Sequence, residues 1–152
     1  MKKDGRAVCA AVLRDSKGCL IGGRIMKSVA TSSFQGELLA IRMGCVMVKA
    51  LGIKGAITEA DNQRAIKLSV SELDHPWEVL SIVQDMKEMC FQESILCNWV
   101  RKNANALAHE VAALEMKGLL PLDCVSNSPT CIQAIICRES LPFCNPSRSV
   151  MP

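Results

Sequence analysis

The feature that most constrains the fold is a pair of apolar runs joined by a tight turn near the N-terminus. Residues 6–14 (RAVCAAVLR) are typical of a buried strand, and residues 19–27 form a second apolar run. Residues 15–18 (DSKG) between them favour a turn, because Gly18 accepts a positive φ. The sequence therefore predicts a β-hairpin. The glycine pair at 22–23 indicates a bulge or a close backbone approach in its second strand.

Segments with helical periodicity alternate with short apolar runs after this hairpin. Thr31, Ser32 and Ser33 offer an N-cap for the first helix, and Gly52 is a plausible residue just past its C-terminus. The order β-β-α-β-α-α-β-α predicts an α/β fold, a mixed β-sheet with helices packed on its faces. The helices are expected at 33–51, 62–70, 77–89 and 106–116, and the later strands at 55–58 and 94–100.

Length and composition set the domain organisation. The chain has 152 residues, of which 49% are hydrophobic, enough for the core of one domain. We expect this domain at residues 1–118. Residues 119–152 are rich in proline and serine and predict an irregular tail, in which the apolar run at 131–137 is a candidate for one short helix or strand. The net charge of +3 permits contact with nucleic acid but does not by itself indicate it.

The nine cysteines show no C-x-x-C spacing typical of a zinc site. No signal peptide follows the first residues, so we expect a reducing, intracellular location, in the nucleus or the cytoplasm. No apolar segment reaches the ~20 residues of a membrane span. Five cysteines lie in apolar runs, where they should act as small hydrophobic residues: Cys9, Cys19, Cys45, Cys90 and Cys97.

Two carboxylates in apolar surroundings are the main candidates for chemistry. Glu37 lies near the start of the first predicted helix, and Asp61 lies just past a short strand. Two such carboxylates can converge on one divalent cation, which is how many proteins cut phosphodiester bonds. Simpler roles are a helix-dipole charge for Glu37 and an N-cap for Asp61 at a helix starting at Asn62.

Five segments in order carry a resemblance to a known family. They are AAVLRDSKG (10–18), QGELLAIRMG (35–44), ITEADN (57–62), PWE (76–78) and VRKNANALAHEVA (100–112). The chain resembles the plant ribonuclease H-like domain, found alone or at the end of LINE-type retroelement polyproteins. This resemblance implies a five-stranded mixed sheet flanked by helices. It also implies hydrolysis of the RNA strand of RNA–DNA hybrids by two Mg²⁺ (or Mn²⁺) ions held by four carboxylates.

The resemblance assigns roles to particular residues. Glu37 and Asp61 match two of the four metal-binding carboxylates, and His109 stands where the last helix carries the fourth. The first aspartate has no clear match, because only five residues precede Arg6; Asp4 is expected to be a turn residue. The first family strand is therefore predicted to be missing. Its absence should leave the edge of the 6–14 strand open.

The connection before the last helix is polar and basic. Arg101, Lys102 and Asn105 are candidate nucleic-acid contacts, with RNA–DNA hybrid or RNA as partner and the chain acting as a monomer. A solvated connection is the alternative for the two basic residues, and a cap is the alternative for Asn62 and Asn105.

These observations favour a ribonuclease H-type domain, predicted to be weakly active or inactive because its carboxylate set is incomplete. Two other functions stay open at this stage. One is a non-catalytic nucleic-acid-binding module, and the other is a degenerate retroelement fragment.

Overall fold

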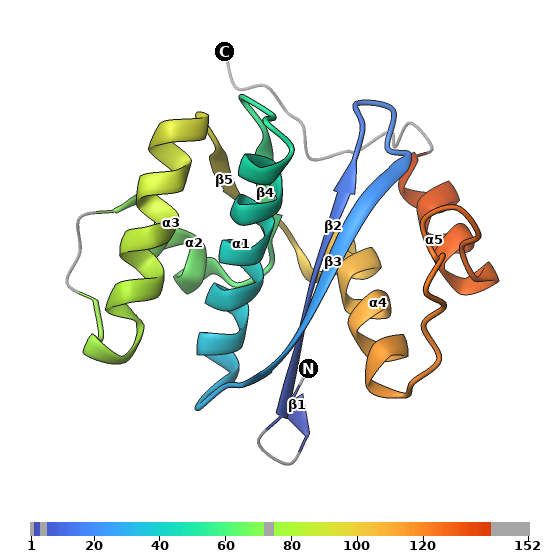
Figure 1. Cartoon of the computed structure of the whole chain (residues 1–152), viewed down its shortest axis with the longest axis horizontal. Coiled ribbons are helices and arrows are strands. Elements are labelled where there is room, and N and C mark those ends of the chain that lie inside the picture. The colour runs from blue at the N-terminus through green and yellow to red at the C-terminus, as the bar shows by residue number, and fades with distance from the viewer. Residues whose placement is uncertain (1, 4–5, 72–74, 141–152) are drawn as a thin grey trace.

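The computed structural model describes residues 2–3, 6–71 and 75–140, and it is an α/β structure. Figure 1 shows the β2–β3 hairpin running through the middle of the molecule, with α1, α2 and α3 on one side and α4 and α5 on the other. The strands are β1 Lys2–Lys3, β2 Arg6–Arg14, β3 Leu20–Val29, β4 Ile57–Ala60 and β5 Leu96–Trp99. The helices are α1 Ser33–Ala50, α2 Gln63–Val70, η1 Trp77–Val79, α3 Leu80–Glu93, η2 Lys102–Asn105, α4 Ala106–Met116 and α5 Thr130–Ser140.

The predicted hairpin is confirmed as the antiparallel pair β2–β3. Its turn is closed by the Asp15 side chain, which accepts hydrogen bonds from the backbone N–H groups of Lys17 and Cys19, while Gly18 has φ +84°. The pairing shifts register between Leu13 and Arg14, at the end where Gly22 pairs. A Cβ on Gly23 would lie 3.2 Å from the Ala11 carbonyl oxygen, so this glycine permits a close backbone approach.

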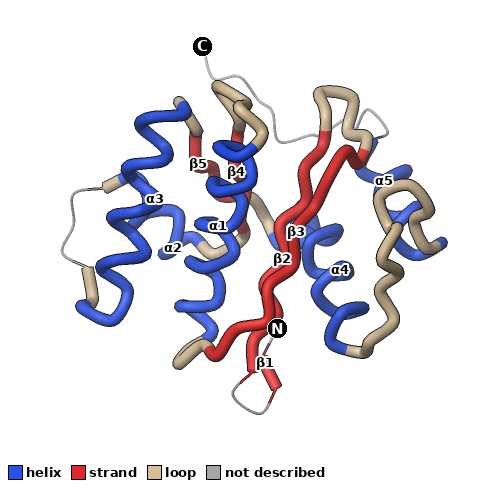
Figure 2. Tube along the Cα trace, viewed as in Figure 1, coloured by secondary structure: helices blue, strands red, loops and turns tan. Residues whose placement is uncertain are grey.

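The strands form two separate sheets among the described residues, as Figure 2 shows in red. One sheet has the order β1-β2-β3, and the other is the parallel pair β4–β5. The two-residue β1 pairs with β2 at Arg6 and Ala7 only. Where the resemblance implies a full first strand, the structure therefore has this short pairing. Asp4, the expected turn residue, lies outside the described residues.

Element boundaries follow local backbone chemistry. Ser32 caps α1 by accepting from the Gln35 backbone N–H, and Gly52 at φ +66° follows its C-terminus. The strand expected at 55–58 is shifted to β4, because Gly55 at φ +72° does not have strand geometry. The strand expected at 94–100 is shortened to β5, because Ser94 adopts a left-handed conformation at φ +54°.

Two hydrophobic cores lie on either side of the gap between the sheets. The first core joins α1, α2 and α3 with the β4–β5 pair, and Leu38, Val83 and Met86 are fully buried in it. The second core joins α4, α5 and one face of the hairpin around Leu107, Val111 and Ile132. The site described below lies between these two cores.

The segment expected to be an irregular tail contributes to the second core. Helix α5 packs against α4 through Ile132, with Ile135 and Ile136 partly buried beside it. The cysteines among the described residues are free. Cys19, expected to act as a small hydrophobic residue in an apolar run, is exposed because it follows the hairpin turn. No helix in the described part of the chain is long and apolar enough to cross a membrane.

Candidate nucleic-acid and metal site

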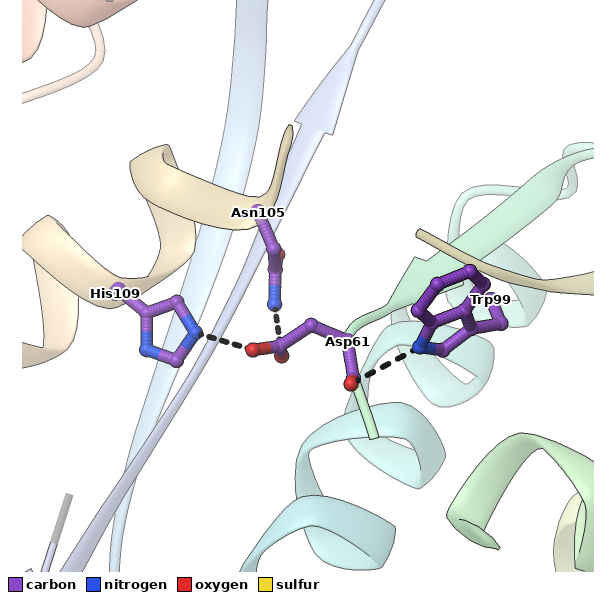
Figure 3. A network of polar contacts seen from close by, with 4 residues as sticks. All are labelled: Asp61, Trp99, Asn105 and His109. Carbon is purple, nitrogen blue, oxygen red and sulfur yellow. Dashed lines mark hydrogen bonds and ion pairs between the residues drawn. The ribbon is translucent and has the colours of Figure 1, made fainter. Parts of the chain in front are cut away.

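Asp61 is the centre of a polar network at the junction of β4 and α2. Its Oδ1 accepts a hydrogen bond from Asn105 Nδ2 at 2.9 Å, and its Oδ2 lies 3.1 Å from His109 Nε2. Its backbone carbonyl accepts a hydrogen bond from Trp99 Nε1 at 3.2 Å. Figure 3 shows Asn105 and His109 on α4 and its N-terminal turn, reaching across to the strand end that carries Asp61.

These contacts show how the side chains of His109, Asp61 and Asn105 are engaged in this structure. An ionised carboxylate can only accept hydrogen bonds, so His109 Nε2 carries the hydrogen in this pair. Asp61 is not the N-cap of α2: Asn62 is, with its Oδ1 accepting from the Ala65 backbone N–H at 3.0 Å. The α4 N-terminus has no side-chain cap, because the Asn105 amide is directed to Asp61 instead.

The environment of Asp61 favours its ionised form. Burial raises the pKa of this carboxyl, since only 13% of its side chain is exposed. The hydrogen bonds from Asn105 and His109, together with the charge on His109, act in the opposite direction and leave the pKa below its ordinary value. Asp61 is therefore held as an oriented carboxylate.

Glu37 lies on α1, one turn after its start, and lines a cleft that His109, Asn105 and Lys102 also line. Burial raises its pKa, and the negative charge of Asp61 raises it further, while His109 and Lys102 lower it by less. The structure thus brings Glu37, Asp61 and His109 into one electrostatic neighbourhood. Two like charges that disfavour each other are an arrangement that a cation would relieve.

The donor set is small for a metal ion. Among the described residues, no three His, Cys, Asp or Glu side chains are grouped so that they could hold a metal. Two carboxylates suit a hard cation such as Mg²⁺ or Mn²⁺, which completes about six positions with water and phosphate oxygens. Glu37 and Asp61 are carboxylates of the right chemical type for such a cation, but within the described residues they belong to no group of three donors.

The basic residues differ in their relation to the cleft. Lys102, at the start of η2, is exposed and lines the cleft beside Glu37. Arg101 is exposed one residue earlier and is not among the residues that line it. Lys102 is consequently the better placed of the two to meet a phosphate at this site.

Two features of the site were not predicted from sequence. The Trp99 indole N–H donates to the Asp61 backbone carbonyl and holds it in place. The sequence showed Trp99 only as one of the alternating residues of a predicted strand. The amide of Asn105 holds the Asp61 carboxylate, a contact between residues 44 positions apart that local sequence could not reveal.

The chain is similar to known proteins in both sequence and structure. Residues 1–115 match the model of the reverse transcriptase-like family, and no curated protein matches. The N-terminal RNase H domain of a Mycobacterium tuberculosis protein, solved as a fusion with maltose-binding protein, is a structural neighbour. Its TM-score is 0.63 at 16% identity, over 76% of this chain and 92% of that one.

These matches define the class as an α/β domain with a ribonuclease H-like fold. The chain belongs to the reverse transcriptase-like family. This confirms the predicted fold class and the resemblance to a ribonuclease H-like domain, while the plant and retroelement origin stays a prediction.

Proposed function

We propose that this protein is a ribonuclease H-type domain that binds RNA–DNA hybrid or RNA and cleaves the RNA strand weakly or not at all. The observation that carries the proposal is that Glu37, His109 and Lys102 line one cleft, while His109 also contacts the Asp61 carboxylate. Family membership supports nucleic acid as the partner.

Each residue has a distinct role in this proposal. Lys102 attracts a backbone phosphate to the mouth of the cleft. Asn105 and His109 keep the Asp61 carboxylate in one orientation, and Trp99 keeps its backbone in place. His109 is a hydrogen-bond donor to Asp61 here and serves as a positioning residue.

Divalent cation chemistry belongs to the proposal in a limited form. Glu37 and Asp61 would hold one Mg²⁺ or Mn²⁺, and when bound this ion would polarise a phosphate and lower the pKa of water. Two hard ligands leave about four positions to water and substrate, so we expect weak binding. Both carboxylate oxygens of Asp61 already have a hydrogen-bond partner, which leaves fewer lone pairs for a cation and weakens its binding further.

Binding is the first property to test. Fluorescence anisotropy with a labelled 18-base-pair RNA–DNA hybrid (a length of about two helical turns) should give saturable binding that weakens with salt. Lys102→Gln should weaken it, whereas the exposed Lys117→Gln, at the far end of α4, should not.

Two results with the same hybrid would contradict the proposal. No saturable binding at low salt by a folded protein would contradict the proposal. Equal binding by both lysine variants would show that the cleft is not where the nucleic acid lies.

A further inference from the structure

Three cysteine side chains meet where α1, α3 and β5 pack together. The Cys90 Sγ atom on α3 lies 3.5 Å from the Cys97 Sγ atom on β5 and 3.9 Å from the Cys45 Sγ atom on α1. Among the described residues, no three donor side chains are grouped so that they could hold a metal ion. The chemistry open to these sulfur atoms is therefore thiol chemistry rather than metal binding.

The three thiols differ in their exposure to solvent. Cys45 is fully buried in the first core, whereas Cys90 and Cys97 are partly exposed at its border. A reagent in solution reaches Cys90 and Cys97 first, because a buried thiol is shielded from it. The closest pair of sulfur atoms is thus also the pair that solvent reaches.

The backbone holds Cys90 and Cys97 opposite each other across the turn from α3 to β5. Ser94 takes a left-handed conformation at φ +54°, and the Ile95 backbone N–H donates to the Cys90 carbonyl at 2.9 Å. A sulfur–sulfur bond is about 2.05 Å long, so the two sulfur atoms need to approach each other by about 1.5 Å. This is a short movement for two side chains that are already in contact.

The neighbouring thiols favour the thiolate form of Cys90. The hydrogen bonds with Cys45 and Cys97 lower the pKa of the Cys90 thiol, while burial acts in the opposite direction. Either sulfur atom of each pair can donate, and a thiolate at Cys90 accepts from both neighbours. Because the thiolate is the nucleophilic form of cysteine, Cys90 is the sulfur that reacts first and Cys97 is its resolving partner.

We propose that Cys90 and Cys97 form an oxidisable dithiol, a modification site at which hydrogen peroxide converts the two thiols into a disulfide. The Cys90 sulfur attacks one peroxide oxygen and the O–O bond breaks. Cys90 becomes a sulfenic acid, and the other oxygen leaves as water with the Cys90 proton. The Cys97 sulfur then attacks the Cys90 sulfur, the S–O bond breaks, and a second water leaves with the Cys97 proton. The two thiols together lose two electrons, which reduce one peroxide to two waters.

The disulfide would fasten the start of β5 to the last turn of α3. The same strand carries Trp99, whose indole N–H donates to the Asp61 carbonyl, so the dithiol lies on an element that positions the candidate site. In compartments that keep thiols reduced, such disulfides are transient. This chemistry requires neither nucleic acid nor a metal ion.

Peptide mapping of the full chain after peroxide treatment tests the proposal. Trypsin cleaves after Lys87 and Arg101, so both cysteines lie in one peptide, residues 88–101. Cleavage of this peptide after Glu93 leaves its two halves joined only where the disulfide has formed. The map therefore identifies the linked pair directly, without a substitution in the protein.

The folded protein should form the Cys90–Cys97 disulfide about ten-fold faster than Cys19, exposed at the hairpin turn, is oxidised. Dithiothreitol should reverse it, and the circular dichroism spectrum should stay unchanged. Oxidation of the pair no faster than Cys19, a disulfide from Cys90 to Cys45 instead, or unfolding on disulfide formation would each overturn the proposal.

Two variants test the order of the steps. With Cys97→Ala, dimedone, which reacts with sulfenic acids, should label Cys90, whereas with Cys90→Ala it should leave Cys97 unlabelled. Cys19→Ala is the matched control outside the cluster and should form the disulfide at the unsubstituted rate. Equal labelling of the two cysteines would overturn the proposed roles. If a variant does not fold, the peptide map of the unsubstituted chain decides.

Discussion

The two halves of the molecule differ in how their cores are completed. The core around α1 and α3 is formed entirely within the family-matched residues 1–115, from helices and the β4–β5 pair. The core around α4 and the hairpin includes Ile132, Ile135 and Ile136 of α5, which lie beyond that match. The second half thus depends on a C-terminal helix for its burial.

This difference bears on the site, because its residues come from both halves. Glu37 and Asp61 are held by the α1 side, while Asn105 and His109 are held by α4. The Asp61 hydrogen bonds therefore connect the two halves. Damage to either core should disturb them.

The largest effect is expected in the first core. Leu38→Ala removes a fully buried side chain and should lower the free energy of unfolding by about 2–5 kcal/mol. Urea unfolding followed by circular dichroism measures it. Leu51→Ala, at a residue 59% exposed just past the same helix, should change stability by no more than about 0.5 kcal/mol.

The second core should be affected locally. Ile132→Ala, at a residue with 0% exposure, should cost about 2–4 kcal/mol, because it leaves Leu107 and Val111 with a cavity. Hydrogen exchange should accelerate in α4 and β3 more than in α3. Equal acceleration in α3 would show that the halves unfold together and that the comparison is wrong.

The two carboxylates should respond to pH with opposite signs. The pKa of Asp61 is lowered by folding, so its contribution is full above its ordinary value of 3.8 and is lost as the pH falls through the folded-state pKa. The pKa of Glu37 is raised by folding, so its ionisation destabilises the folded state. This destabilisation is absent below the ordinary pKa of 4.5, grows as the pH rises, and is complete above the folded-state pKa.

Thermal unfolding at pH 7 and pH 3 checks these signs. Asp61→Asn should destabilise at pH 7 by about 1–3 kcal/mol, and less at pH 3. Glu37→Gln should stabilise by a few tenths of a kcal/mol to about 1 at pH 7, with no gain at pH 3. Glu78→Gln on exposed η1 is the control. The same sign for both variants at pH 7 would contradict the electrostatic description.

The smallest effect concerns nucleic-acid binding. Lys102→Gln should reduce the slope of log K against log salt by about 0.9, the value for one phosphate contact. Arg101→Gln should reduce it less, because Arg101 does not line the cleft. Salt titration of hybrid binding measures both. A larger change for Arg101→Gln would place the phosphate outside the cleft.

The fold could be predicted largely because its signals are local. The hairpin followed from two apolar runs, at 6–14 and 19–27, joined by a turn that ends at Gly18, and the helix expected at 106–116 agrees with α4. Errors occurred where one residue changed the backbone, as at Gly55 and Ser94. The α5 packing was not predicted, because it depends on contacts with α4 far away in sequence.

The candidate site was predictable only in part for the same reason. Glu37 and Asp61 stood out as carboxylates in apolar surroundings, and the structure brings them into one neighbourhood. The network of Asn105, His109 and Trp99 around Asp61 requires tertiary contacts over 38 to 48 positions. The metal-binding role of Glu37 and Asp61 stays a prediction, and so does the nucleic-acid-binding role of Arg101, Lys102 and Asn105.

The central claim is that this domain binds hybrid in the cleft but lacks a complete hydrolytic site. A single-turnover assay, with protein in excess over labelled RNA–DNA hybrid and Mg²⁺ or Mn²⁺ at about 10 mM (an excess over the ~10⁻⁴–10⁻³ M dissociation constants of weak oxygen-ligand sites), tests it most directly. We predict saturable binding with cleavage no more than about ten-fold above the Asp61→Asn variant, a difference of ~1.4 kcal/mol in activation free energy. Robust cleavage that Asp61→Asn abolishes would contradict this account.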